Sequence, residues 1–483
     1  MESETIFQVG SKFDYLENRT DNKIYLRKQQ SFVLDCLNNY LGTVKFCIDD
    51  HLWLLFLSRK RKYFMKKLTK ERICNALDWR YKHWIKYPLY RKLMPLRIKH
   101  IRSKKVIKVL FVITEVGPWK TRELYKAMVK HRRFRPFIGI SESREVPDEK
   151  NELIHFLKKK GIPFVDLDKD TKNVFHNISA DIIFYQKPYD EVYQKNIRYW
   201  NHMKSLFCYV YYGFHSSDVS WSVNLPLFDY SWQQYFENTL AASLHRLSLM
   251  HDKGKQAVVT GLPIQDQLSQ PKSQYVDPWK KQDHTKKRII YAPHHTIGNE
   301  HLSGLALSSF LENGEIMLEL MHKYEDKVQW AFKPHPLLYT KLIKLWGKEK
   351  TDRYYDEWRN SENSQYENGE YDALFKYSDA MVHDCCSFTI EYHYTKNPVM
   401  YLLRQQGRES TYNEFGQRAF DLHYKGHTKE EIEQFIENVI NGIDPLKGER
   451  ENFYNECLIP PHGKTACENI INAILGEAEY KDN

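Results

Sequence analysis

Short apolar segments alternate with helical segments from residue 105 onward, and this alternation limits the possible folds more than any other feature of the chain. Val106–Thr114 is an almost continuous apolar run, which is typical of a strand buried on both faces of a parallel sheet. A predicted helix at Thr121–His131 and a predicted strand at Phe134–Ile140 follow. Parallel strands need crossover connections, so this spacing predicts βα units. We therefore expect an α/β fold.

The predicted strands fall into two series, separated by a polar segment. Gln265–Lys287 contains two prolines and is predicted to be an interdomain linker. A chain of 483 residues is also too long for one core. The predicted domains are a basic helical extension (1–104), a first domain (105–270), a second domain (286–445) and closing helices (446–483). The other predicted strands are Pro163–Leu167, Ala180–Gln186, Ser205–Tyr212, Val258–Pro263, Arg288–Pro293, Trp330–Phe332, Ala380–Val382 and Pro398–Leu402. The helices predicted in the second series are Ser308–Tyr324, Lys341–Arg359, Tyr371–Tyr377, Glu430–Asn441 and Thr465–Glu477.

Residues 59–108 form the most basic part of the chain, in which Trp and Tyr are interleaved with Lys and Arg and only Glu71 and Asp78 are acidic. Aromatic rings settle at a membrane interface while Lys and Arg meet anionic lipid, which favours contact with a membrane surface. A helix pair packed on the next domain explains the pattern equally well. The net charge of +10 favours an anionic partner. Nucleic acid is not expected, because no zinc-finger, RRM or KH signature is present.

No segment is predicted to cross a membrane. The most apolar run, His51–Ser58, is too short to do so, and the start of the chain does not resemble a signal peptide. The eight cysteines are scattered and form no CxxC motif, which is typical of reduced thiols. We expect a cytoplasmic protein whose membrane contact, if it has one, is peripheral at the inner face of the cell membrane.

Gln329–Pro336 (QWAFKPHP) is the strongest candidate for a functional segment. Its first half is predicted to be a strand, and Lys333-Pro334-His335-Pro336 ends it. Two prolines hold His335 on a stiff, extended turn. Ligands of open α/β sheets bind at the carboxyl ends of strands, so Lys333 and His335 are predicted to contact a ligand.

Paired histidines follow another predicted strand end, at His294-His295. Neighbouring side chains on extended backbone point to opposite sides, and no His, Asp or Glu cluster surrounds this pair in the sequence. We therefore expect a phosphate or substrate contact here and no metal.

Two further strand ends carry candidate residues. Asp384–Ser387 forms a predicted turn before a helix that begins at Phe388, and a helix start offers unpaired N–H groups to a phosphate. Ser387 and Thr389 add hydroxyl groups. In the first domain, Gly213–Asp218 follows a buried strand and contains His215, which is placed where a base for an acceptor hydroxyl is needed.

Three segments together resemble the CDP-glycerol glycerophosphotransferase family, the teichoic-acid primase and polymerase group. They are YAPHH (291–295), FKPHP (332–336) and SDAMVHDCCSFTIEYHYTKNPVMYL (378–402). The resemblance covers residues 105–475 in outline and is strongest in the second domain. It implies a GT-B architecture, in which two Rossmann-like domains face each other across a cleft and the second binds most of the donor nucleotide. It also implies peripheral attachment at the cytoplasmic membrane face.

The chain departs from the family pattern at three points. Cys385-Cys386 replaces the usual Tyr-Ser pair, His294-His295-Thr296 stands where an Arg is usual, and Tyr212–His215 is only a loose counterpart of a WHG turn. These departures concern the identity of the donor and of the base.

The resemblance implies transfer of glycerol phosphate, or a related alditol phosphate, from a CDP-activated donor to a hydroxyl of a cell-surface glycan or lipid-linked polymer, with release of CMP. Such chemistry depends on positioning and charge stabilisation. His215 is the predicted base and His335 is predicted to stabilise the diphosphate, without metal or cofactor. The predicted donor-binding residues are His294, His295, Lys333, Asp384, Ser387, Phe388, Thr389 and Glu391. The alternatives are a GT-B glycosyltransferase that uses a nucleotide sugar and a non-catalytic protein that binds membrane or polyanion.

Overall fold

The computed structural model describes residues 81–145, 149–169, 177–217, 225–248, 256–297, 307–404 and 412–477. The chain divides into two compact units, Met1–Ile85 and Lys86–Asn483, and everything below concerns the second. Most of the predicted basic extension lies outside the described residues. Its last part is α5 (Tyr87–Ser103), whose Tyr90, Met94 and Ile101 are buried. Because Tyr90 stacks on Phe207 of a central strand, this helix is part of the folded second unit.

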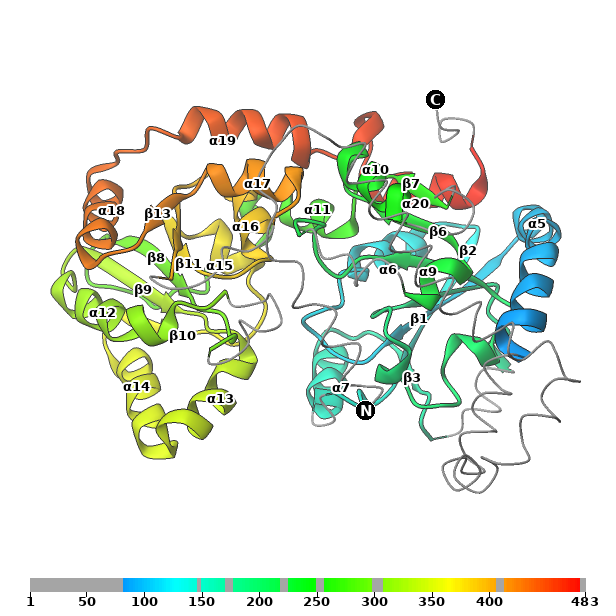
Figure 1. Cartoon of the computed structure of the whole chain (residues 1–483), viewed down its shortest axis with the longest axis horizontal. Coiled ribbons are helices and arrows are strands. Elements are labelled where there is room, and N and C mark those ends of the chain that lie inside the picture. The colour runs from blue at the N-terminus through cyan, green and yellow to red at the C-terminus, as the bar shows by residue number, and fades with distance from the viewer. Residues whose placement is uncertain are drawn as a thin grey trace, which may run out of the picture. The chain divides into compact units, whose positions relative to one another are not determined.

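In the described part of the first half, seven strands form one parallel sheet in the order β3-β2-β1-β4-β5-β6-β7 (Figure 1). The central strands are fully buried because they are apolar on both faces, as predicted for a sheet covered by helices. The strands are β1 (Ile107–Ile113), β2 (Phe134–Ile140), β3 (Phe164–Asp166), β4 (Ile182–Tyr185), β5 (Leu206–Val210), β6 (Ser231–Phe236) and β7 (Ala257–Val259).

The helices of the first half include one from the end of the chain. Asp266 of α11 accepts hydrogen bonds from the backbone N–H groups of Ala466 and Cys467, at 2.7 and 2.8 Å. This carboxylate therefore satisfies the start of α20 (Ala466–Leu475), which packs against α11 and α6. The other helices are α6 (Arg122–Lys130), α7 (Glu149–Lys159), α9 (Pro226–Tyr230), α10 (Thr239–Ser248) and α11 (Pro263–Leu268).

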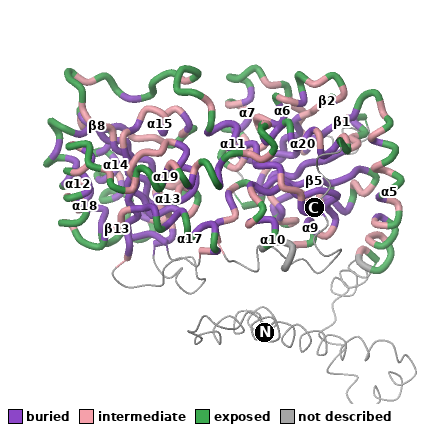
Figure 2. Tube along the Cα trace, turned by 90° about the horizontal axis from the view of Figure 1, so that it is seen from above, coloured by how far each residue is buried: buried purple, intermediate pink, exposed green. Residues whose placement is uncertain are grey.

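Six strands of the described second half form another parallel sheet, in the order β10-β9-β8-β11-β12-β13. Its strands run through the buried interior, with exposed helices outside them (Figure 2). The strands are β8 (Lys287–Ala292), β9 (Val328–Phe332), β10 (Ser364–Tyr366), β11 (Ala380–His383), β12 (Val399–Leu402) and β13 (Tyr424–Gly426). The helices are α12 (Phe310–Lys323), α13 (Pro336–Trp346), α14 (Lys348–Asn360), α15 (Asp372–Lys376), α16 (Phe388–Glu391), α17 (Glu414–Asp421), α18 (Lys429–Asn441) and α19 (Lys447–Phe453).

The structure corrects the sequence prediction at several elements. The single helix predicted over Lys341–Arg359 is two helices, because Gly347 adopts a φ of 79° that ends α13 before α14 begins. Three strands were not predicted: β6, β10 and β13. The latter two contain only three residues each, which is too short for a periodic signal. β6 carries Gln233 and Gln234 in its buried centre, so it does not stand out as an apolar run.

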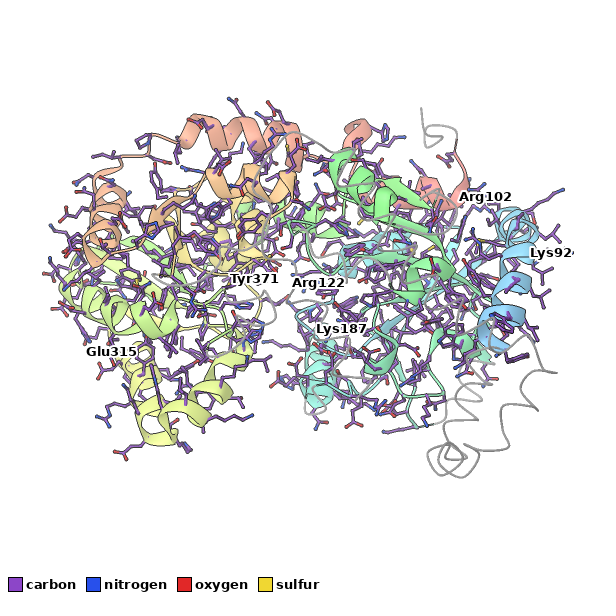
Figure 3. All side chains as sticks on the ribbon, in the orientation of Figure 1. Lys92, Arg102, Arg122, Lys187, Glu315 and Tyr371 are labelled. Atoms are coloured by element: carbon purple, nitrogen blue, oxygen red, sulfur yellow. The ribbon has the colours of Figure 1, made fainter. Side chains whose placement is uncertain are left out.

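Within the described residues, the two halves share one apolar core cluster and are also joined by two sets of polar contacts. In the first, Asn413 at the start of α17 donates from its backbone N–H to the carbonyl oxygen of Ser216, at 3.0 Å. Gly416 permits this close approach, because a Cβ there would lie 2.0 Å from the same oxygen. In the second, Arg122 of α6 pairs with Glu370 and Asp372, near Tyr371 (Figure 3). Polar contacts at α17 and charged contacts at α6 therefore join the two halves.

Candidate functional site

Three neighbouring strands of the second sheet end at one edge, and the loops after them are tied together. β9, β8 and β11 are adjacent and parallel, so their carboxyl ends share one side of the sheet. The backbone N–H of His335 donates to the carbonyl oxygen of Pro293, at 3.0 Å, and the thiol of Cys385 donates to that of Ala292, at 3.1 Å. The KPHP turn and the turn after β11 are therefore both held against the end of β8 and the loop that follows it.

The side chains of His294, His295 and His335 form a compact group, which we call the histidine cluster. The ring centroids are 4.4 Å apart for His294 and His295, 4.1 Å for His295 and His335, and 5.1 Å for His294 and His335. The expectation that the paired histidines point apart is wrong. It assumed extended backbone, whereas the chain bends at His295 and Ile297 donates its N–H back to the carbonyl oxygen of His295.

Two histidines of the cluster, His294 and His335, are held in the neutral form. Burial lowers the pKa of His335 to about 3 and that of His294 well below its usual value of 6.5, and the neighbouring imidazoles and Lys341 act in the same direction. One ligand nitrogen from each of the three rings lies within 4.8 Å of the others, a spacing that could accommodate a metal ion. The hydrogen bonds of the rings decide between a metal and another ligand.

Asp384 fixes the loops around the cluster. Its carboxylate is buried, and it accepts hydrogen bonds from the backbone N–H groups of His294 and Ser309 and from the hydroxyl of Ser309. Burial raises the pKa of Asp384 to about 6, although these hydrogen bonds oppose the shift. The sequence analysis predicted direct contact between Asp384 and the nucleotide donor. Its carboxylate instead accepts three hydrogen bonds from the protein, and these connect the end of β11 to the loop after β8 and to the start of α12.

Lys333 is buried beside the cluster. Its Nζ donates to the carbonyl oxygen of Gly369 at 2.8 Å and lies 5.5 Å from the centre of the Tyr371 ring. Burial lowers the pKa of Lys333 to about 8, so its side chain is still charged at neutral pH. A positive charge is therefore held in a dry position near His335, which suits stabilisation of a diphosphate.

The turn after β11 is arranged differently from the prediction. The helix expected from Phe388 onward is α16, which has only four residues and passes into a 3₁₀ turn, so it offers little dipole. The hydroxyl of Thr389 donates to the carbonyl oxygen of Cys385 at 3.0 Å, and Phe388 packs on Tyr371. Ser387 lies at the start of α16 and its side chain makes no capping hydrogen bond.

Glu391 also has partners within the protein. Its carboxylate is fully buried, accepts a hydrogen bond from the hydroxyl of Tyr371 and lies 3.7 Å from Nζ of Lys120, which comes from the first half of the chain. Glu391 would have to give up these partners in order to contact the nucleotide donor. Thr389 would likewise have to give up its hydrogen bond to Cys385. The sequence could not reveal this, because Lys120 lies far from Glu391 along the chain.

His215 is paired with a residue that the sequence analysis missed. Its Nδ1 lies 2.9 Å from a carboxylate oxygen of Glu237, and its backbone N–H donates to the other oxygen at 2.6 Å. Glu237 directly follows β6, the unpredicted strand beside β5, and is buried. A carboxylate in contact with Nδ1 holds the ring in the tautomer whose Nε2 can accept a proton. His215 and Glu237 therefore have the geometry of a general-base dyad.

The loop that carries His215 contacts the turn after β11. The hydroxyls of Ser216 and Ser217 lie 3.4 and 3.2 Å from Sγ of Cys386. Cys385 and Cys386 replace the Tyr-Ser pair of the family pattern, and here one thiol packs beneath the loop after β8 while the other meets the first half. The candidate base and the second-sheet turns thus belong to one connected region.

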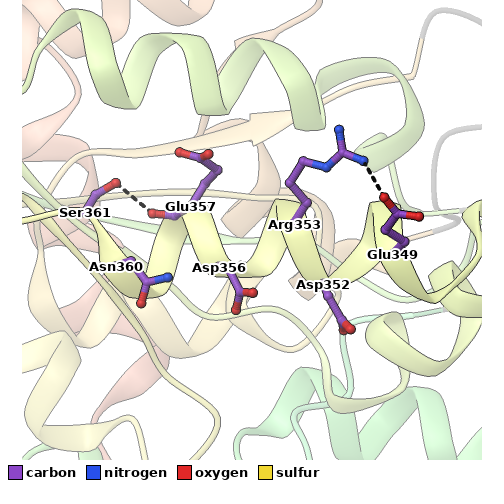
Figure 4. Close-up of a pocket in the computed structure, with 7 residues that line it drawn as sticks. All are labelled: Glu349, Asp352, Arg353, Asp356, Glu357, Asn360 and Ser361. Carbon is purple, nitrogen blue, oxygen red and sulfur yellow. Dashed lines mark hydrogen bonds and ion pairs between the residues drawn. The ribbon is translucent and has the colours of Figure 1, made fainter.

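A hollow elsewhere on the surface does not suit an anionic donor. It has a volume of about 590 Å³ and lies along α14, where Glu349, Asp352, Asp356 and Glu357 contribute four carboxylates (Figure 4). Arg353 is its one cation, and its guanidinium lies 3.6 Å from Glu349. The negative charge would repel a diphosphate, so this hollow is not a candidate donor site.

One family of known proteins matches this chain in sequence. Residues 237–468 match the sequence model of the family described as CDP-Glycerol:Poly(glycerophosphate) glycerophosphotransferase. The family resemblance is confirmed. The matched segment contains the histidine cluster, the turn after β11 and Glu237. No curated protein sequence matches the chain.

Several solved structures are similar to this chain at low sequence identity. A putative UDP-N-acetylglucosamine 2-epimerase from Listeria monocytogenes is 14% identical with a TM-score of 0.51, covering 78% of this chain and 98% of its own. The wall teichoic acid polymerase TagF is 13% identical with a TM-score of 0.49, covering 85% and 100%. MnaA of S. aureus, in a co-structure with UDP, is 14% identical with a TM-score of 0.49, covering 76% and 96%. Together with the two parallel sheets, the likeness to the epimerase confirms an α/β fold of the GT-B type.

Replacement of Lys333 by Met should raise the free energy of unfolding at pH 7 by about 1–2 kcal/mol, because a buried charge is removed at the expense of one hydrogen bond to Gly369. Below pH 8 the folded and unfolded states both carry the charge, and the folded state bears the full cost of burial. Between pH 8 and 10.5 the folded state loses its proton first, so the unsubstituted protein gains stability and approaches the variant.

Urea unfolding at pH 7 and at pH 9.5 measures this difference. Lys344→Met, at an exposed position of α13, is the matched control and should change stability little at either pH. A Lys333→Met variant that is less stable than the unsubstituted protein at pH 7 would contradict the account of Lys333 as a strained buried cation.

Proposed function

We propose that the protein transfers glycerol phosphate, or a related alditol phosphate, from a CDP-activated donor to a hydroxyl of a cell-surface glycan or lipid-linked polymer. The family match over residues 237–468 supports glycerol phosphate transfer in cell-wall polymer synthesis. The observation that carries the finer proposal is the connection between two groups: the His215–Glu237 dyad and the second-sheet turns, which meet through Ser216, Ser217 and Cys386. A base and a positively charged edge in one region suit transfer of a phosphoryl group to a hydroxyl.

In this proposal each of these groups has a part in the reaction. Nε2 of His215 accepts the proton of the acceptor hydroxyl while its oxygen attacks the β-phosphorus of the donor. The bond between the β-phosphorus and the bridging oxygen breaks, and CMP leaves with that oxygen. Charge on the phosphoryl oxygens is stabilised by Lys333 and by the N-terminus of α13, at which His335 is the N-cap. Glu237 stabilises the imidazolium that forms on His215.

The purified protein should release CMP from CDP-glycerol in the presence of a glycan or lipid-linked acceptor, and His335→Ala should abolish this release because the site loses an imidazole and the cap of α13. His322→Ala, an exposed histidine of α12, is the matched control. A panel of CDP-glycerol, CDP-ribitol and UDP-sugars identifies the donor. Turnover with UDP-sugars alone would replace the proposal by a glycosyltransferase, and undiminished turnover of His335→Ala would remove the assigned site.

Glu237→Gln should lower kcat by about 10²–10⁴-fold and change the Kd of CDP-glycerol by less than about twofold, because the amide cannot stabilise the imidazolium that forms during transfer. Steady-state kinetics with saturating acceptor and calorimetric titration of the donor separate the two effects. Glu414→Gln, at the exposed first residue of α17, is the control for loss of a carboxylate near the contact between the two halves. An unchanged kcat for Glu237→Gln would exclude His215 as the base.

The same proposal includes peripheral contact with the anionic inner face of the cell membrane. Among the described residues, no helix is long and apolar enough to cross a bilayer. α5 has no acidic residue, and Leu89 and Leu96 are 54% and 67% exposed on the side that carries Lys92 and Lys99. Exposed leucines between lysines suit an interface with anionic lipid.

Leu89→Glu combined with Leu96→Glu should reduce sedimentation of the protein with phosphatidylglycerol vesicles by about fivefold or more, because two apolar contacts are replaced by charges that the lipid repels. Leu345→Glu, at a position of α13 that is 55% exposed, should leave sedimentation unchanged. Equal binding of both variants would exclude α5 as the membrane contact.

A further inference from the structure

The hydrogen bonds of the histidine cluster determine where its protons lie. Oγ1 of Thr296 accepts hydrogen bonds from the backbone N–H groups of Leu307 and Ser308, at 3.0 and 3.2 Å. These two bonds use both lone pairs of the hydroxyl, so its proton is available to donate. Nδ1 of His294 lies 2.9 Å from the same oxygen, and the backbone N–H of Thr296 points at that nitrogen from 3.4 Å. Nδ1 of His294 is therefore an acceptor, and the proton of this neutral ring is on Nε2.

His335 reaches the same state by a different route. As the N-cap of α13, its Nδ1 accepts the backbone N–H of Leu337, at 3.2 Å. A neutral ring whose Nδ1 accepts a hydrogen bond carries its proton on Nε2. Within the described residues, neither His294 nor His335 has a hydrogen-bond partner at Nε2. The cluster therefore presents two N–H donors that the protein itself does not use.

This arrangement opposes a metal ion. A divalent metal needs a lone pair on each ligating nitrogen, and the Nε2 atoms of His294 and His335 carry protons instead. Because the candidate ligand group in the described chain is these histidines with His295, the tautomers of the rings decide the question. Lys333, Lys341 and the positive end of α13 add positive charge around it. Neutral N–H donors beside fixed positive charge suit an oxyanion.

We propose that Thr296 is a positioning residue: its hydroxyl holds His294 in the tautomer whose Nε2–H donates to an oxygen of the donor diphosphate. This inference rests on the proposed function. Thr296 then acts on the ligand only through the ring of His294. The donor pair of His294 and His335 recognises a diphosphate without becoming charged, and Lys333 supplies the charge.

A double-mutant cycle read out by calorimetric titration with CDP-glycerol tests this role. Thr296→Val should weaken binding by about tenfold, the equivalent of one lost donor, and Thr296→Ser should restore it to within about twofold. His294→Gln places an amide N–H where Nε2–H stood and needs no tautomer, so it should bind within about threefold of the unsubstituted protein, whereas His294→Ala should lose about tenfold. In the His294→Gln background, Thr296→Val should have no further effect.

The outcomes separate the possible failures. A tenfold loss from Thr296→Val in both backgrounds would show that Thr296 only supports the loop, and would overturn the inference. Titration of the full-length protein with Zn²⁺ is the second measurement: tight binding that both His294→Gln and His294→Ala abolish would identify a metal site and also overturn it. If the unsubstituted protein binds no CDP-glycerol, the proposed function fails together with this inference. If Thr296→Val leaves the binding of CDP-glycerol unchanged, only this inference fails and the proposed function stands.

Discussion

The buried carboxylate of Asp384 is the contact on which the candidate site depends. It accepts the backbone N–H groups of His294 and Ser309, so the loop after β8, the turn after β11 and the start of α12 are held by one side chain. The cost of burying this carboxylate is visible in its pKa, which is raised to about 6 even with three hydrogen bonds. These hydrogen bonds fix the backbone of the histidine cluster in the absence of a ligand.

Preorganisation of this kind explains why polar groups are buried at the edge of the second sheet. His294 and His335 are neutral, Lys333 is a charged side chain held in a dry position, and each is oriented by a contact with the protein: Thr296, the amide of Leu337 and the carbonyl of Gly369. Phosphoryl transfer requires little covalent chemistry from an enzyme and much electrostatic positioning. A site whose hydrogen-bond donors are already oriented needs little reorganisation during the reaction, and burial of a charged Lys333 fits such a site.

The comparison between sequence and structure shows which features local patterns encode. Strands such as β1 and β5 were predicted because a strand buried on both faces is almost continuously apolar. β6 was missed because it buries Gln233 and Gln234, whose side chains donate to the carbonyl oxygens of Ala473 and Phe228, and Glu237 was missed with it. The position of His335 followed from its prolines, but the cluster depends on a bend at His295 that no periodicity indicates. The contact of Glu391 with Lys120 joins residues from different halves, which a single sequence cannot reveal.

The central claim is that the diphosphate of a CDP-activated donor lies on the histidine cluster with its transferable group directed at His215. A crystal structure of the full-length protein with CDP-glycerol, at a resolution that places the phosphates, tests this most directly. The account predicts phosphate oxygens about 3 Å from Nε2 of His294 and His335, and the β-phosphorus on the side of His215. A nucleotide bound elsewhere, or a diphosphate that contacts neither imidazole, would contradict it.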